Sequence, residues 1–262
     1  MGRCFERSHR SYSSDRVWDE CQYKWKATTA EGGKFPFVVN ERMAIGSAVD
    51  AYVSGALASE RVTMEDAWVN AIATRDGQVA IIFNETACLE ELGRFKPKCD
   101  ELIETLMPHI REVQPEWHFT IEGEEYHAHP DFLMDDYSIF DLKTSQRRLE
   151  ADRVHFDTQL TAYAYASVAV GNPLPPAVAL VAMISNKSGV TFDTQQGTRS
   201  EKQLGAFASD VKARLIAQKG ALKDDNYTRN GRAHPYACGS CAVKSSCPSW
   251  AGTELEQLGE EN

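Results

Sequence analysis

Residues 130–144 read PDFLMDDYSIFDLKT, and this stretch carries the strongest structural signal in the chain. Two short apolar runs within it, separated by a turn-forming pair of aspartates, predict neighbouring strands. Because residues two apart on a strand point to the same face, Asp141 and Lys143 are expected to project together from one strand. The preceding strand can bring Asp131 alongside them, so the stretch predicts a cluster of two carboxylates and one amine.

Short strands and helices are predicted on both sides of this stretch. The predicted strands are residues 117–121, 125–129, 132–134, 138–142, 177–184 and 190–193, of which the first four form a β-meander. The predicted helices are residues 11–25, with Ser13 or Ser14 as N-cap, 46–58, 63–74, 90–110, 154–170 and 201–219. The chain is thus mainly helical before Pro115 and has a sheet flanked by helices after it, which indicates an α/β layer fold.

The size and composition of the chain predict one domain. With 262 residues and 42% hydrophobic content, it can bury a single substantial core, so residues 1–262 are expected to fold together. The longest apolar stretch, around residues 177–184, is too short to span a membrane, and the N-terminus lacks the apolar segment of a secretory signal. We therefore expect a cytoplasmic protein without a membrane partner. The net charge of −10 argues against general coating of DNA but not against local DNA contacts.

The carboxylates and the lysine suggest hydrolytic chemistry. Two convergent carboxylates, Asp131 and Asp141, suit a hard, oxygen-seeking cation such as Mg²⁺. Lys143 can orient or deprotonate an attacking water and stabilise developing negative charge, while the metal polarises a scissile phosphate. A D-x-K triplet alone is a weak signal, because the same residues also occur as a solvated pair on an edge strand.

The surroundings of the triplet favour the catalytic interpretation. Gln159 and Tyr163 are four residues apart in a predicted helix and hence share one helix face. The order of the motifs PD (130–131), DLKT (141–144) and Q-x-x-x-Y (159–163) resembles the active site of RecB-like PD-(D/E)XK nucleases. The resemblance implies a restriction-endonuclease-type core, in which a central mixed sheet is flanked by helices.

The same resemblance implies the roles of the site residues. Asp131 and Asp141 would be ligands of Mg²⁺ or Mn²⁺, and Lys143 the catalytic lysine. Gln159 and Tyr163 would form a supporting motif beside the DNA.

One position departs from the family pattern, which usually has a histidine in G-x-x-x-H on an early helix. Here Gly46 is followed four residues later by Asp50, whose carboxylate can also ligate Mg²⁺ or Mn²⁺; an ordinary surface aspartate is the alternative. The change leaves the choice between the two metals open. Glu116 resembles an acidic residue often found in the family, with a solvated strand-end glutamate as the alternative. His127 and His129 alternate on one strand face, either as supporting residues of the site or as packing or surface residues.

Four of the seven cysteines suggest a metal centre. Cys238, Cys241 and Cys247 form a C-x2-C-x5-C motif whose thiolates can reach one centre, and Cys21 is the best candidate for the fourth ligand. An N-terminal cysteine combined with this motif resembles the iron-sulfur staple of Cas-four-type and AddB-type exonucleases. It implies a 4Fe-4S cluster, with structural Zn²⁺ as the alternative. The remaining thiols, Cys4, Cys88 and Cys99, are expected to pack without a metal.

These expectations divide the single domain into four parts. They are a helical N-terminal part with the first cluster cysteine (11–110), the nuclease core (115–220), the cluster-binding segment (227–250) and an acidic tail (252–262). Basic residues placed to contact phosphates are Arg147, Arg148 and Arg153, with a second patch at Lys212, Arg214, Lys219, Lys223, Arg229 and Arg232. Ordinary solvated helix faces would carry basic residues in the same pattern, so they are the alternative for both patches.

The resemblance predicts a metal-dependent DNA exonuclease that acts on single-stranded ends in a bacterial or phage-infected cell. Recombination and repair, phage DNA processing and CRISPR adaptation share this chemistry, so a helicase or adaptation proteins are possible partners. The alternative is a catalytically inactive DNA-binding or scaffold module that keeps the fold and the cluster. Intact Asp131, Asp141, Lys143 and Gln159 argue against that alternative.

Overall fold

The computed structural model describes residues 10–30, 40–73, 84–229, 238, 241, 243, 246 and 247. The acidic tail (252–262), Cys4, Arg232 and the rest of the predicted cluster-binding segment lie outside the described residues. No described helix has both the length and the apolar character that crossing a bilayer requires.

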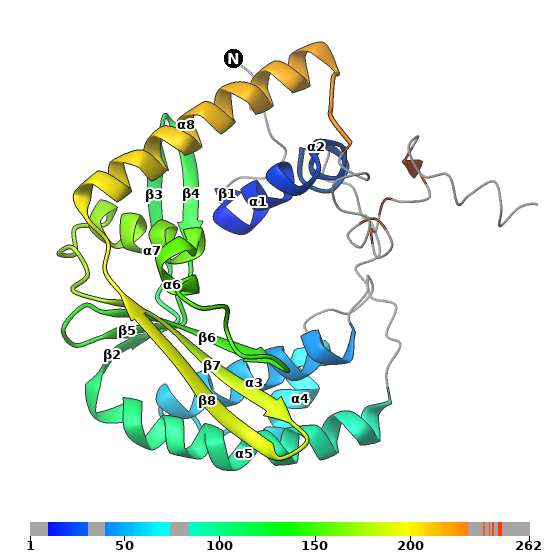
Figure 1. The fold of residues 1–262 in the computed structure, drawn as a ribbon, viewed down its shortest axis with the longest axis vertical. Coiled ribbons are helices and arrows are strands. Elements are labelled where there is room, and N and C mark those ends of the chain that lie inside the picture. The colour runs from blue at the N-terminus through cyan, green and yellow to red at the C-terminus, as the bar shows by residue number, and fades with distance from the viewer. Residues whose placement is uncertain are drawn as a thin grey trace, which may run out of the picture.

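A five-stranded mixed sheet forms the centre of the fold, in the order β2-β5-β6-β7-β8 (Figure 1). Its strands are β2 (Ile110–Val113), β5 (Phe132–Met134), β6 (Ile139–Ser145), β7 (Val178–Asn186) and β8 (Gly189–Gly197). β6 and β7 are parallel, and the other neighbours are antiparallel. A mixed sheet with helices around it confirms the predicted α/β class.

Helices cover both faces of this sheet because its strands present apolar side chains to each face. One face packs on α3 (Glu41–Leu57), α4 (Met64–Ala73) and α5 (Glu85–Leu106). The opposite face packs on α6 (Arg153–Phe156) and α7 (Thr158–Ala169). In β6, Leu142 faces the first group and Ile139 the second, as the period of two along a strand requires.

A second sheet corrects the prediction of a single meander. β3 (Trp117–Ile121) and β4 (Glu124–Ala128) pair antiparallel, and the two-residue strand β1 (Arg10–Ser11) pairs in parallel with β4. Because β1 and β3 occupy the two edges of β4, β5 pairs with β2 and β6 instead. The helix predicted over residues 90–110 ends sooner, at Leu106, because a 3-10 turn with Pro108 follows (Met107–His109) and Ile110 already begins β2.

Two predicted helices are interrupted. The helix expected over residues 11–25 is divided at Cys21, whose backbone is extended (φ −164°, ψ 114°), into α1 (Tyr12–Glu20) and α2 (Gln22–Trp25). Its N-cap is Ser11, not Ser13 or Ser14, because Ser11 and Ser14 form a reciprocal capping box. Likewise, Asp157 ends α6 and caps α7 through the backbone N–H groups of Gln159 and Leu160.

The long helix α8 (Glu201–Asp224) lies along the three-stranded sheet and reaches α1 (Figure 1). Its apolar contacts include Phe207, Val211 and Leu215, which pack against Ile121 and Tyr126.

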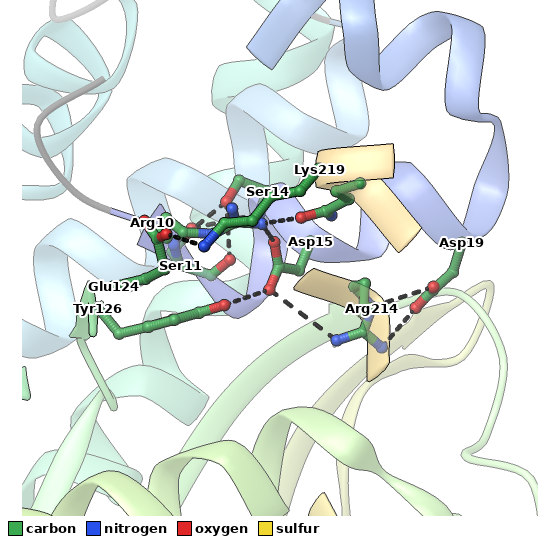
Figure 2. A network of polar contacts seen from close by, with 10 residues as sticks. Arg10, Ser11, Ser14, Asp15, Asp19, Glu124, Tyr126, Arg214 and Lys219 are labelled. Carbon is green, nitrogen blue, oxygen red and sulfur yellow. Dashed lines mark hydrogen bonds and ion pairs between the residues drawn. The ribbon is translucent and has the colours of Figure 1, made fainter. Parts of the chain in front are cut away.

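A polar network joins α1, β4 and α8 (Figure 2). Asp15, only 1% exposed, pairs with Arg10 and accepts a 2.9 Å hydrogen bond from the Tyr126 hydroxyl. Arg214 of α8 lies 3.9 Å from Asp15 and donates two hydrogen bonds to Asp19, at 3.1 and 2.9 Å. Burial, with the Asp15 charge beside it, raises the pKa of Tyr126. A buried charge is tolerated only with partners of this kind, so the network fixes α1 in place.

We expect Tyr126→Phe to lower the free energy of unfolding by about 1.5 to 3 kcal/mol, because a hydrogen bond to a buried charged group is lost without any change in packing shape. Urea unfolding followed by circular dichroism measures the effect. Tyr137→Phe, at a half-buried position outside the network, is the matched control. Equal stability of Tyr126→Phe and wild type would contradict a stabilising role for the network.

Candidate active site

Strand β6 places Asp141 and Lys143 on the face of the sheet that packs against α7. The Lys143 ammonium lies 2.6 Å from Oδ2 of Asp141, which is 1% exposed. The parallel pairing with β7 sets this position, since Asp141 is opposite Leu180 and Lys143 opposite Ala182 in the register. A buried strand thus holds the carboxylate rigidly, while the lysine extends to a less buried position.

Asp131 lies beside β6, in the turn between β4 and β5. Its Oδ2 accepts a 2.6 Å hydrogen bond from the backbone N–H of Leu142, the residue between Asp141 and Lys143. Its carbonyl oxygen accepts another, at 2.8 Å, from the N–H of Gln114. The two aspartates of the sequence motif therefore meet at the middle of β6.

Helix α3 brings a third carboxylate to the same place. A Cβ at Gly46 would lie only 2.9 Å from Oγ1 of Thr144, so glycine lets the helix approach β6 closely. Asp50 follows one helical turn later. The charges of Lys143 and Asp141 both act on its carboxyl group, which places Asp50 at the site and not on an ordinary solvated surface.

Gln114 is a site residue that the sequence analysis missed. Its backbone adopts a left-handed conformation (φ 47°), and its side-chain amide donates to Oδ2 of Asp50 at 3.0 Å and to Oγ of Ser54 at 3.2 Å. With its N–H bonded to the Asp131 carbonyl, Gln114 connects Asp50 to Asp131. No periodicity or motif marks such a residue, because its role depends on its backbone conformation and on contacts between distant segments.

The electrostatics of the three carboxylates suit a divalent cation. Burial, then the charges of Asp141 and Asp50, raises the pKa of Asp131 to about 8. Burial also raises the pKa of Asp141 and of Asp50, and the Lys143 ammonium opposes each shift. Among the described residues, no group donates a well-directed hydrogen bond to either oxygen of Asp141. Buried carboxylates that repel one another, with the Lys143 ammonium as a nearby positive charge that acts on all three, form the ligand set expected for Mg²⁺ or Mn²⁺.

Helix α7 completes the site with Gln159 and Tyr163. The Gln159 amide donates to the Tyr163 hydroxyl at 2.7 Å. Burial, followed by the charges of Asp141 and Asp131, raises the pKa of Tyr163, so the phenol keeps its proton at neutral pH. Both residues line a cavity of about 230 Å³ that extends to β4 and α1.

The four predicted cluster cysteines are near one another. Burial, then the charges of Cys241, Cys21 and Cys247, raises the pKa of Cys238. In the same region, the Tyr23 hydroxyl donates to the carbonyl of Ser246 at 2.9 Å, which holds α2 to the C-terminal segment. Cys21 itself lies at the break between α1 and α2, and its charge is one of those that act on Cys238.

Two further thiols lie in α5, away from this group. Cys88 and Cys99 are buried, and Cys99 lies 3.9 Å from the Met183 sulfur, with its pKa raised by burial to about 12. They behave as packing residues, as predicted.

The two predicted basic patches differ in their surroundings. Arg147 and Arg148 are exposed directly after β6, whereas Arg153 lies 3.5 Å from Asp157. In the second patch, Lys212 pairs with Glu122, Arg214 with Asp19, and Lys219 with Glu124. Carboxylates of the chain itself therefore neutralise much of the second patch.

Comparisons with known proteins place these features in context. A family model described as the PD-(D/E)XK nuclease superfamily matches residues 9–248. A candidate exonuclease from Eubacterium rectale has a similar structure, with a TM-score of 0.62 and 13% identity over 86% of this chain and 85% of its own. An alkaline exonuclease from Laribacter hongkongensis matches 70% of this chain and 91% of its own at 14% identity, with a TM-score of only 0.32. No curated protein sequence matches the chain. The TM-score of the first structure shows that its fold is shared with this chain.

Proposed function

The chain belongs to the PD-(D/E)XK nuclease superfamily, and on this premise we propose that it is an Mg²⁺- or Mn²⁺-dependent exonuclease that hydrolyses DNA from single-stranded ends. The observation that carries the proposal is the convergence of Asp50, Asp131 and Asp141 beside Lys143. Three carboxylates buried close enough to raise one another's pKa are costly for the fold, whereas a nuclease needs a cation at such a position.

The residues of the site divide the work of hydrolysis. Asp50, Asp131 and Asp141 would hold the divalent cation, which when bound supplies a positive charge that polarises the scissile phosphate. As an ammonium, Lys143 can orient the attacking water and stabilise negative charge on the phosphate oxygens, whereas only its neutral amine could take the proton of that water. Tyr163, held by Gln159, keeps a hydroxyl donor next to the carboxylates.

The preference for single-stranded ends is the finer part of the proposal. The resemblance to iron-sulfur exonucleases and the description of the Eubacterium rectale protein support exonuclease action. Exposed Arg147 and Arg148 directly after β6 are suited to contact phosphates of a strand entering the site. A helicase, or proteins of recombination, repair or CRISPR adaptation, would supply such ends.

Digestion of labelled DNA tests the proposal. We expect a linear, end-labelled single strand to release mononucleotides with Mg²⁺ or Mn²⁺, a circular single strand to survive, and a chelator to stop the reaction. Cleavage of the circle at the same rate would replace the exonuclease assignment with an endonuclease. No cleavage of single-stranded or duplex DNA with either metal, despite DNA binding, would favour an inactive scaffold.

Asp50 gives a specific prediction about the metal. Asp50→Ala is expected to raise the metal concentration needed for half-maximal cleavage by at least about tenfold, because one of three ligands is lost and even the loss of a partner behind a metal ligand costs about 10- to 100-fold in affinity. Asp50→His should remain active but shift towards Mn²⁺, since imidazole suits the softer ion better. Cleavage rates across Mg²⁺ and Mn²⁺ titrations measure both effects. Glu104→Ala, at an exposed position of α5, is the control. An unchanged metal requirement in Asp50→Ala would show that Asp50 is not a ligand.

A further inference from the structure

The β3–β4 pair carries a second group of metal-ligating side chains. His118 of β3 and His127 of β4 are direct partners in the antiparallel register. Glu116 lies two residues before His118, and His129 two residues after His127, so the alternation of strand faces brings all four to one side of the pair. Tyr126, directly before His127, points to the other side and packs against α8. The sequence analysis identified three members of this array but missed His118.

Three of these side chains already converge. Nε2 of His118 lies 3.0 Å from Oε1 of Glu116, and Nδ1 of His127 lies 3.7 Å from the same oxygen. The three ligand atoms all lie within 4.8 Å of one another, and the two imidazole centroids are 3.9 Å apart. A zinc ion with bonds of about 2.0 to 2.1 Å holds tetrahedral neighbours about 3.3 Å apart, so small side-chain rotations are sufficient.

Two of the three side chains are exposed enough for an ion to reach them. The side chains of Glu116 and His118 are 57% and 58% exposed, so they can rotate without disturbing the core, whereas His127 is 14% exposed and fixed. A surface pair of Glu and His contributes little stability in itself. One buried imidazole with two exposed side chains beside it therefore suits the binding of an ion better than it suits stabilisation of the fold.

The ligand chemistry differs from that of the nuclease site. Two imidazole nitrogens and one carboxylate suit a borderline ion such as Zn²⁺, whereas three carboxylates suit Mg²⁺ or Mn²⁺. The two groups also lie on different strands, since Asp141 is on β6 of the five-stranded sheet. A protein that uses Mg²⁺ for one purpose can therefore bind Zn²⁺ at the other position without competition.

We propose that Glu116, His118 and His127 bind one divalent transition-metal ion of the zinc type, with His129 next to them as a further ligand. The bound ion would fasten β3 to β4 where β1 joins the sheet, because Ser11 of β1 pairs with His127. His127 and His129 also line the cavity that contains Gln159 and Tyr163, so the ion would stiffen one wall of the space next to the nuclease site.

Calorimetric titration of the full chain with Zn²⁺, in the presence of excess Mg²⁺ to occupy the carboxylates, tests the proposal. Zn²⁺ that binds to cysteines or carboxylates binds equally to every variant. The informative quantity is therefore the difference in Zn²⁺ affinity and stoichiometry between each variant and wild type. We expect His118→Ala and His127→Ala each to weaken one Zn²⁺ site by at least about tenfold. His109→Ala, at another exposed histidine, should leave that site unchanged.

Equal Zn²⁺ affinity and stoichiometry in wild type, His118→Ala and His127→Ala would overturn the proposal, as would an equal loss in His109→Ala. Because His118 is largely exposed, its replacement should leave the circular dichroism spectrum unchanged. Anomalous scattering from crystals grown with Zn²⁺ provides an independent measurement. A peak between Glu116 and His118 supports the site, and peaks only at other positions overturn it.

Discussion

Alanine in place of Asp141 or Lys143 is expected to reduce DNA cleavage by more than about 1,000-fold while leaving the fold intact. Asp141 is the proposed buried oxygen ligand, and burial raises the pKa of its carboxyl group, so its removal takes away cation binding more than stability. Lys143 lies beside it and is only partly buried, so its loss removes the positive charge and a hydrogen-bond donor but little packing. Initial rates on end-labelled DNA at saturating Mg²⁺ measure both effects.

Controls of matched chemistry separate this effect from a general change of charge. Asp210→Ala and Lys202→Ala, both exposed on α8, should cleave at the wild-type rate. Thermal unfolding should show that Asp141→Ala is folded. DNA binding, measured with a chelator present, should decrease much less than cleavage. Rates near wild type in both Asp141→Ala and Lys143→Ala would remove the site assignment.

Replacement of Cys21 by serine should have the largest effect on stability. We expect protein purified without oxygen to be brown and to contain about four iron atoms per chain, as a thiolate-bound 4Fe-4S cluster requires. Cys21→Ser should lose this iron and lower the free energy of unfolding by about 4 to 5 kcal/mol, by analogy with the loss of a disulfide that closes a loop of this length. Iron analysis and denaturant unfolding measure the two effects.

The cluster prediction has two separate points of failure. Colourless protein with one zinc and no iron, even when prepared without oxygen, would replace the cluster by a structural zinc bound to the same cysteines. Unchanged metal content in Cys21→Ser would remove the link between the N-terminal helix and the C-terminal cysteines altogether. Cys88→Ser is the control for iron content, because Cys88 is buried in α5 away from the cluster cysteines.

The sequence predicted those parts of the fold that depend on local pattern. Strands β3 and β5 were predicted with their observed bounds, α4 and β7 within two residues, and α3 with its start five residues late. Local alternation and helical periodicity determine these elements, and both are visible in the sequence. The order of the PD, DLKT and Q-x-x-x-Y motifs also indicated in advance which side chains lie together.

Features that depend on distant contacts could not be predicted. The strand β1 has only two residues, and its partner β4 is far along the chain, so no local pattern marks it. Without β1, nothing in the sequence indicates that β4 has both edges occupied and that the meander divides into two sheets. His118 was missed for a related reason, because its proximity to His127 follows from the register of the two strands.

During synthesis, the N-terminal strand leaves the ribosome long before its partners exist. Arg10 of β1 needs β4 for its backbone pairing and Gln218 of α8 for its side chain. Asp50, Asp131 and Asp141, in contrast, all lie between α3 and β6, and this segment is complete well before α8. Contacts between residues far apart in the sequence form late, because the chain between them must lose conformational entropy before the contact contributes any stabilising energy. We therefore expect the growing chain to assemble its carboxylates first and to attach its N-terminal helix last.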